Sequence, residues 1–337
     1  MAGLDPAIHV HSSRKHTWMP GPRRFLGPGH DKAGVGIVMS PPRSPLAGMA
    51  LVAFGAIGFG LMPLFARIAY AEGLPPLSLL SWRFGITTLC LLPFLGSMIA
   101  AKREMLVATL SGAGYMGINL FYFLALERLT VGLTVLILFT YPLFTILIGW
   151  LGFKERLTWQ NALAALLVLA AAILILSPAG FGDGTLDWVG IGMAFVPPAA
   201  YALFVHVAAK RLSRMAIPVR LGGVFLGGLI AMLVLGMIMD GGIRNPASMA
   251  GWGAVVALAL LSTVVALGLL LIGAPAAGAE RTAIAGASEL VTALMVGAIA
   301  FGERLDIRMI GGTILILVAI LLAAQSPAAT HNQPHAD

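Results

Sequence analysis

One carboxyl group lies inside a long apolar stretch of this 337-residue chain. Glu289 is six residues into the stretch 283–301, which otherwise consists mainly of Ala, Val, Leu and Gly. An ionisable side chain within the hydrocarbon of a membrane is costly, so it is a functional candidate by default. A carboxyl at this depth could exchange a proton or pair with a cationic substrate. The alternative is a structural carboxyl held by Ser288, Thr292 or a neighbouring helix.

A cation and an imidazole interrupt two other apolar stretches. Arg83 lies about seven residues into the stretch 76–97, where its guanidinium needs a carboxylate, carbonyl groups or water. It could capture the carboxylate or phosphate of a substrate, or it could lock two helices together. His206 lies near the end of the stretch 188–209 and could relay protons, because imidazole titrates near neutrality. The simpler interpretation of His206 is a hydrated side chain near the membrane surface.

Polar side chains form a stripe in the stretch 105–125. Spacings of four, four and three residues place Ser111, Tyr115, Asn119 and Tyr122 on one helical face. Lipid would not favour that face, so we expect it to point into a helical bundle. There it would form the wall of a pocket for a small amphipathic molecule. Hydrogen bonds between helices are the alternative.

Two further tyrosines stand near prolines in apolar stretches. Tyr141 directly precedes Pro142, which frees a carbonyl in the previous turn and can kink the helix. Tyr201 follows Pro197-Pro198 by about one turn, and this proline pair predicts a break near the middle of its helix. Both tyrosine rings are candidates for the pocket. For Tyr141, packing between helices is an equal alternative.

The composition indicates which elements carry these side chains. The chain is 59% hydrophobic and 10% charged, with a mean hydropathy of +0.94. A soluble chain averages about 25% charged residues, so this chain has too little polar surface for a water-soluble globule. The single cysteine, Cys90, excludes a disulfide framework and a cysteine-based metal site. We expect neither a cofactor nor a bound metal.

Long apolar stretches predict an all-α polytopic membrane protein with ten transmembrane helices. A helix that crosses the hydrocarbon needs about 20 mostly apolar residues. The alternating pattern of outer-membrane β-strands is absent from the sequence. The ten stretches are approximately 47–70, 76–97, 105–125, 131–151, 159–177, 188–209, 218–239, 251–272, 283–301 and 308–324.

Lys and Arg in the connections predict the orientation, because positive charge is retained on the cytoplasmic side. With the amino terminus inside, the inner connections carry nine such residues and the outer connections four. Ten crossings then place both termini in the cytoplasm of a bacterial cell, with the protein in the inner membrane. The net charge of +7 therefore reflects topology beside an anionic leaflet, and no nucleic acid is expected as a partner.

The first 46 residues are basic, rich in Pro and Gly, and without periodicity. We predict a disordered cytoplasmic tail over 1–46. It is not a signal peptide, because no short apolar core with a cleavage site follows its charges. The tail resembles translated intergenic sequence, so Met39 or Met49 could be the true start. Residues 325–337 are predicted to form a second cytoplasmic tail.

A motif recurs along the chain. Phe153-Lys154-Glu155-Arg156-Leu157 and Phe301-Gly302-Glu303-Arg304-Leu305 each precede one last apolar stretch, at an offset of 148 residues. Glu-Arg pairs at 127–128 and 280–281 recur in the same order. The halves are therefore 47–177 and 188–324, with five predicted helices each. Because five is odd, the second half enters the membrane from the opposite side, as an inverted repeat.

The repeat relates the candidate residues of the two halves. Glu289 and Tyr141 each stand 14 residues before the Glu of their motif, so we expect both to face the same central region. The partner of the polar stripe offers only Ser262 and Thr263, which predicts a cavity that is more polar on the side of the first half. Gly223 and Gly227 form a Gly-x-x-x-Gly pair, which predicts close helix packing inside the bundle.

The chain resembles the drug/metabolite transporter superfamily, of the EamA type, over about residues 47–324. Besides the Glu-Arg-Leu ends, the matching pieces are Trp82-Arg83-Phe84, Tyr141-Pro142-Leu143, Gly152 to Leu157 and Pro197 to Tyr201. The resemblance implies a ten-helix duplication that transports small metabolites. One departure is Leu290, where the family usually has Pro. It puts the usual kink of the ninth helix in doubt and leaves Glu289 in its place.

These observations predict a secondary transporter of small metabolites, such as amino acids or related amines. The resemblance favours export, Glu289 indicates protons as a coupling ion, and the repeats indicate alternating access at a central cavity. Without a catalytic motif or a nucleotide-binding fingerprint, an enzyme is not expected. A lipid flippase or scramblase and an uptake permease remain open alternatives, with a scaffold or receptor after them. The expected partners are a small molecule and the bilayer, and the chain acts as a monomer or homodimer.

Overall fold

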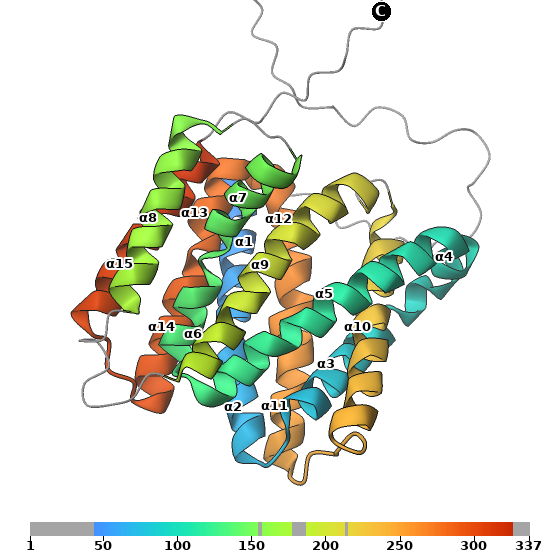
Figure 1. Cartoon of the computed structure of the whole chain (residues 1–337). Coiled ribbons are helices and arrows are strands. Elements are labelled where there is room, and N and C mark those ends of the chain that lie inside the picture. Colours follow the sequence, from blue (N-terminus) through green and yellow to red (C-terminus); the bar gives the residue numbers. More distant parts are fainter. Residues whose placement is uncertain (1–43, 154–156, 177–186, 213–214, 326–337) are drawn as a thin grey trace, which may run out of the picture. The chain divides into compact units, whose positions relative to one another are not determined.

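Helices account for all of the regular secondary structure in the part of the chain that the structure describes (Figure 1). The structure is a computed structural model, and it describes residues 44–153, 157–176, 187–212 and 215–325. These residues belong to one compact unit, 37–337. The predicted tails lie outside the described residues, apart from positions 44–46 and 325, and α1 already begins at Pro45. The motif residues Glu155 and Arg156 also lie outside them.

The helices follow the predicted apolar stretches closely. Their bounds are α1 (Pro45–Gly60), α2 (Met62–Ala71), α3 (Pro76–Cys90), the 3₁₀ turn η1 (Leu92–Phe94), α4 (Leu95–Ala100), α5 (Lys102–Arg128), α6 (Val131–Leu138), α7 (Tyr141–Phe153), α8 (Trp159–Ile175), α9 (Trp188–Arg211), α10 (Ile217–Met239), α11 (Met249–Ala259), the π-helical turn η3 (Leu260–Val265), α12 (Ala266–Ala277), α13 (Ala279–Gly286), α14 (Ser288–Phe301) and α15 (Ile307–Ala324).

Eight helical segments in the described part of the chain are long and apolar enough to cross a membrane. Four are the single helices α5, α9, α10 and α15, and four are the consecutive pairs α1–α2, α6–α7, α11–α12 and α13–α14. The count rises to nine if α3 and α4, which are bent by 48° at η1, form one span. The remaining predicted stretch forms α8, which is apolar but has only 17 residues. Many large apolar side chains point outward, among them Ile238 and Ile299, which are 75% and 74% exposed. The chain is therefore a multi-pass membrane protein whose outer face suits lipid.

Close helix packing depends on small residues at the contacts. A Cβ atom on Gly112 of α5 would overlap the backbone of Val224 in α10, and one on Gly227 would overlap the backbone of Thr109. The predicted packing role of the Gly223 and Gly227 pair is thus confirmed, because both glycines face α5. Figure 1 shows the same kind of close pairing between α8 and α15 at one edge of the bundle.

Several helices are interrupted near their middle. One residue, Leu61, separates α1 from α2, residues 139–140 separate α6 from α7, and Ala287 separates α13 from α14. The sequence put the usual kink of the ninth helix in doubt, because Leu290 stands where the family usually has Pro. The helix is nevertheless interrupted, at Ala287. Here the chain turns at a run of small residues and needs no proline ring.

The predicted break at Pro197-Pro198 is also wrong, because α9 runs through both prolines. A proline removes one backbone donor, yet its fixed φ is compatible with a helix. Within a membrane the rest of the hydrogen-bond ladder is strongly favoured, and neighbouring helices support the freed carbonyls.

Hydrogen bonds tie the helices together at one end of the bundle. Glu303 reaches across to α6, where its carboxylate accepts from the backbone N–H groups of Val131, at 2.6 Å, and Gly132, at 2.9 Å. Gly297 leaves room for this carboxylate, because a Cβ there would overlap it. Arg67 donates to the carbonyl of Leu129 at the same end.

The connections between other helices are joined at this end too. Trp82 Nε1 donates to the carbonyl of Arg244 at 3.1 Å, and the Ser248 hydroxyl donates to Glu72 at 2.5 Å. Arg128 donates to Asp187 at 2.7 and 3.2 Å, and these bonds hold the pKa of the Asp187 carboxyl below its usual range. This ion pair therefore stabilises the fold above the ordinary pKa of Asp and is lost as the pH falls through the lowered one. We call this end of the bundle the tied end.

Replacing Gly112 by Ala should separate α5 from α10. The added methyl group has no free space, so we expect the free energy of unfolding to fall by about 1–3 kcal/mol. Thermal unfolding of the purified protein in detergent measures the loss. Gly114→Ala on the same helix is the control, because its Cβ meets nothing within 4 Å and alanine favours a helix. Equal melting temperatures for the two variants would contradict this packing.

Replacing Glu303 by Ala should loosen the tied end. It leaves two helix-terminal N–H groups without their acceptor, and we expect a loss of about 2–3 kcal/mol in the free energy of unfolding. Glu303→Gln should lose less, because the amide keeps one acceptor oxygen. Arg304→Ala, at an exposed neighbouring position, should change stability by less than about 0.5 kcal/mol. If the two alanine variants melt alike, the carboxylate does not tie the halves.

Candidate functional site

A cavity of about 600 Å³ lies among the interrupted helices. Most of its walls are apolar side chains of α1, α5, α10 and α12. Residues next to three of the helix interruptions also line it, namely Met62, Leu138 and Gly286. Its polar lining consists of Arg83, Tyr115, Asn119, Tyr122, Tyr201, Arg220, Thr263 and Glu289. A mostly apolar pocket with a few polar groups is the usual form of a small-molecule site.

Six of the eight predicted site residues line this central cavity. Three of the four residues of the stripe on α5, Tyr115, Asn119 and Tyr122, are in the lining, whereas Ser111 is not. Arg83, Tyr201 and Glu289 reach it from three other helices. The sequence therefore identified the side chains that the fold brings together, although they are spread over more than 200 positions of the chain.

Arg83 is 5% exposed and has no ion-pair partner among the described residues. Its Nε donates to the hydroxyl oxygen of Thr263 at 2.9 Å, and its Nη1 lies 3.6 Å from the sulfur of Met62. The rings of Phe84 and Phe123 lie 5.5 and 5.6 Å from its Cζ. A buried guanidinium is thus supported by one hydroxyl and two aromatic faces, with no carboxylate to balance its charge.

Glu289 is the second residue of α14 and follows directly on the interruption at Ala287. Within the described part of the chain its carboxylate has neither a hydrogen bond nor an ion pair. Ser288 does not hold it, because the Ser288 hydroxyl lies 2.7 Å from the carbonyl of Ala285 and 3.2 Å from that of Ala53. The same cavity therefore contains two cations, Arg83 and Arg220, and one acid, Glu289. Neither Arg83 nor Glu289 has a charged partner among the described residues.

Aromatic rings form one wall of the cavity. Tyr115 stacks on Phe204 with ring centroids 4.2 Å apart, and Tyr201 lies 6.2 Å from Tyr115. Tyr141 meets Tyr201 edge to face at 5.2 Å, from the side away from the cavity lining. This wall offers flat apolar surface and hydroxyl groups to a bound molecule.

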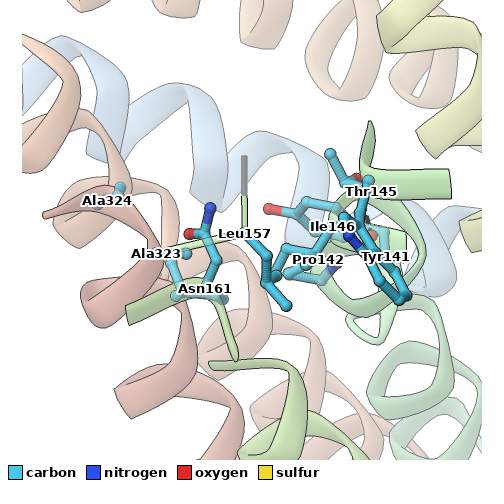
Figure 2. A pocket seen from close by; sticks show the side chains of 11 residues that line it. Tyr141, Pro142, Thr145, Ile146, Leu157, Asn161, Ala323 and Ala324 are labelled. Atoms are coloured by element: carbon cyan, nitrogen blue, oxygen red, sulfur yellow. Dashed lines mark hydrogen bonds between the residues drawn. The ribbon is translucent and has the colours of Figure 1, made fainter. Parts of the chain in front are cut away.

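Tyr141 itself lines a second cavity of about 400 Å³ between α7, α8, α13 and α15 (Figure 2). Figure 2 shows Asn161 and Ala323 on one side of this cavity and Tyr141 and Thr145 on the other. Tyr141 is not part of the lining of the central cavity, but it contacts Tyr201, which is. The expectation that Tyr141 and Glu289 face one central region stays a prediction.

His206 also lies outside the lining of the central cavity. It is buried, its Nδ1 lies 2.8 Å from the carbonyl of Ala202, and its ring stacks on Phe153 at 4.7 Å. The hydrated interfacial histidine considered from the sequence does not match this burial. A role for His206 in moving protons stays a prediction.

The cavity extends away from the tied end. Its lining continues from Arg83 and Glu289 to Leu212, just past the end of α9, and to Arg220 in the first turn of α10. Sequence reasoning treated Arg220 only as one of the charges in the inner connections. It named Thr263 as a polar counterpart of the stripe on α5 but did not predict its contact with Arg83.

The comparisons with known proteins agree with this architecture. The sequence matches the EamA-like transporter family over residues 46–177 and 188–325. No match is found among curated proteins. A solved crystal structure of another protein has a TM-score of 0.58 and 21% identity, covering 82% of this chain and 96% of that one, which shows a shared fold. Two family matches in tandem cover most of the sequence, and the chain belongs to the EamA-like transporter family.

Proposed function

We propose that this protein is a secondary transporter that exports small zwitterionic metabolites, such as amino acids, across a bacterial inner membrane. The observation that carries the proposal is the presence of Arg83 and Glu289 in one cavity, each without a charged partner among the described residues. A zwitterion supplies a carboxylate for the guanidinium and an ammonium group for the acid. Its side chain would meet the aromatic wall of Tyr115 and Tyr201.

The proposal also includes ten transmembrane spans. The ten spans would be α1–α2, α3–α4, α5, α6–α7, α8, α9, α10, α11–α12, α13–α14 and α15. Packing between helices supports an inverted repeat. Each main contact between two helices recurs between the two helices that occupy the equivalent places in the opposite halves. For example, α5 packs on α9 as α12 packs on α1, and α7 packs on α9 as α14 packs on α1. Two further contacts, of α8 with α15 and of α6 with α14, join helices that are equivalent to each other in the two halves.

Access to the cavity would alternate between the two ends of the bundle. The distribution of Lys and Arg favours a cytoplasmic location for the end near Leu212 and Arg220. The tied end would then face outward and be closed, while the cavity extends toward the cytoplasm. An exporter loads its substrate in this state. Rocking of the halves would exchange the open and closed ends.

Protons are the coupling ion in this proposal, and Glu289 is the group that exchanges them. A carboxylate without a protein partner can alternate between a proton and the ammonium group of a substrate. Binding of one then excludes the other, which is the competition that an antiporter needs. Arg83 stays charged throughout and retains the carboxylate of the substrate.

The proposed function predicts a change in the metabolites outside producing cells. Cells that overproduce the wild-type chain should accumulate at least one amino acid or related amine in the medium, compared with an empty vector and at matched growth. Arg83→Leu should return that metabolite to the vector level. Quantitative analysis of the medium measures both effects. Identical profiles for wild type and vector would contradict export.

Glu289→Gln should abolish coupling to protons. The amide keeps the size of the side chain but cannot release a proton, so we expect a pH gradient to stop driving flux in proteoliposomes. The expected loss of pH-driven flux is at least about tenfold, with an unchanged melting temperature. Glu280→Gln, at an exposed position outside the central cavity, is the control. A pH-driven flux that survives in Glu289→Gln would remove Glu289 from coupling.

Movement of lipid is the second candidate function, and the second cavity favours it. That cavity lies among apolar helices, and its rim residues Trp150 and Leu157 are 49% and 46% exposed. It could hold an acyl chain while the wall of Tyr141 and Tyr201 separates it from the charged groups. Dithionite quenching of a fluorescent phospholipid in proteoliposomes tests this alternative. Quenching of only the outer leaflet would exclude it.

A further inference from the structure

The orientation of Arg83 depends on one hydroxyl group. An arginine side chain has many rotamers, and binding a carboxylate requires its planar fork to face the ligand. Phe84 and Phe123 lie beside the guanidinium, but a cation–π contact does not set the direction of its N–H groups. The Nε–H donated to Thr263 at 2.9 Å is the directional contact that does so.

The direction of that hydrogen bond is set by a second one. Thr263 is 3% exposed, and its hydroxyl donates to the carbonyl of Leu258 at 3.0 Å. A hydroxyl has one proton, so the oxygen of Thr263 is left as an acceptor. It can receive Nε–H of Arg83 but cannot offer a proton to a ligand. The hydroxyl therefore acts as a fixed acceptor for the guanidinium.

The π-helical turn η3 places this hydroxyl. Leu258 and Thr263 are five residues apart, which is the spacing of a π-helix, and Thr263 lies within the π turn Leu260–Val265. Removing the extra residue of a π turn would rotate the following positions by about 100° around the helix axis. Thr263 would then leave Arg83. Gly58 of α1 makes room beside this turn, since a Cβ there would lie 3.1 Å from the carbonyl oxygen of Leu261.

One edge of the guanidinium remains for a ligand. Thr263 occupies Nε, Nη1 has only the thioether of Met62 at 3.6 Å, and Nη2 has no partner among the described residues. The pair Nη1 and Nη2 can form two parallel hydrogen bonds to a carboxylate. We propose that Thr263 is a positioning residue that turns Arg83 so that this end of its fork binds the carboxylate of the substrate. This inference rests on the proposed function.

Binding of three related molecules to the purified full-length protein tests the inference. The probes are L-leucine, 3-methylbutylamine, which lacks the carboxylate, and 4-methylpentanoate, which lacks the ammonium group. Isothermal titration calorimetry measures each affinity for wild type, Thr263→Val, Thr263→Ala and Thr263→Ser. We expect Kd for the two carboxylates to rise about tenfold or more in the Val and Ala variants, because a hydrogen bond to a charged group is lost. The affinity for 3-methylbutylamine should not change, and Thr263→Ser should retain wild-type binding.

A neighbour in the same turn provides the matched control. Ser262 is buried, its hydroxyl has no hydrogen-bond partner in the described structure, and it does not line the cavity. Ser262→Ala should therefore bind all three probes as wild type does. Arg83→Lys should lose preference for L-leucine over 3-methylbutylamine, because an ammonium group lacks the planar fork.

The outcomes separate this inference from the proposed function. If Arg83→Lys weakens L-leucine binding and neither Thr263→Val nor Thr263→Ala does, the positioning role is wrong and the proposed function stands. If the Thr263 variants weaken the amine as much as the two carboxylates, Thr263 only supports the cavity wall and the inference is wrong. If wild type binds none of the carboxylate probes, both the inference and the proposed zwitterion site are contradicted.

Discussion

The membrane interior offers no water to an open backbone, and this constraint decides where the helices can be interrupted. Every backbone group freed by a break must find a partner in the protein or face a hydrated cavity. In this chain, Met62, Leu138 and Gly286 each lie beside an interruption and line the central cavity, and Thr263 lies in the π turn. Three of the breaks and the π turn therefore border one space. That space also holds the side chains of Arg83 and Glu289.

The low polarity of the membrane interior also makes the unpaired charges in the cavity informative. A buried guanidinium and a carboxylate would normally pair, because an isolated charge in a medium of low polarity is unfavourable. Here Arg83 has a hydroxyl and aromatic faces, and Glu289 has no hydrogen bond among the described residues. A pair that joined directly would be more stable but would leave nothing for a substrate. In the function that we propose, keeping the two groups apart leaves both charges available to a zwitterionic substrate.

Much of this arrangement could be predicted from the sequence because membrane helices leave strong local signals. The apolar stretches, the repeated Glu-Arg-Leu motif and the isolated positions of Arg83 and Glu289 are visible without any structure. Thr263 was noticed but not assigned, because its contact with Arg83 depends on a π turn that has no sequence signature here. The contact of Tyr141 with Tyr201, a residue 60 positions away, also has no signal in the sequence. Pro197 and Pro198 misled for a different reason, since a membrane helix can retain its ladder around proline.

The contacts of the tied end suit the alternating access that we propose, in which this end opens again. Glu303 caps N–H groups in the first turn of α6, and Arg67 donates to the carbonyl of Leu129, just past the end of α5. Such terminal groups have no partner within their own helix, and water can replace the side chain when the end opens. The net cost of each exchange is then of the order of 1 kcal/mol, whereas breaking a buried ion pair by removing one partner costs about 3–5 kcal/mol. A closure built from helix ends can therefore be stable in one state and still be released within a transport cycle.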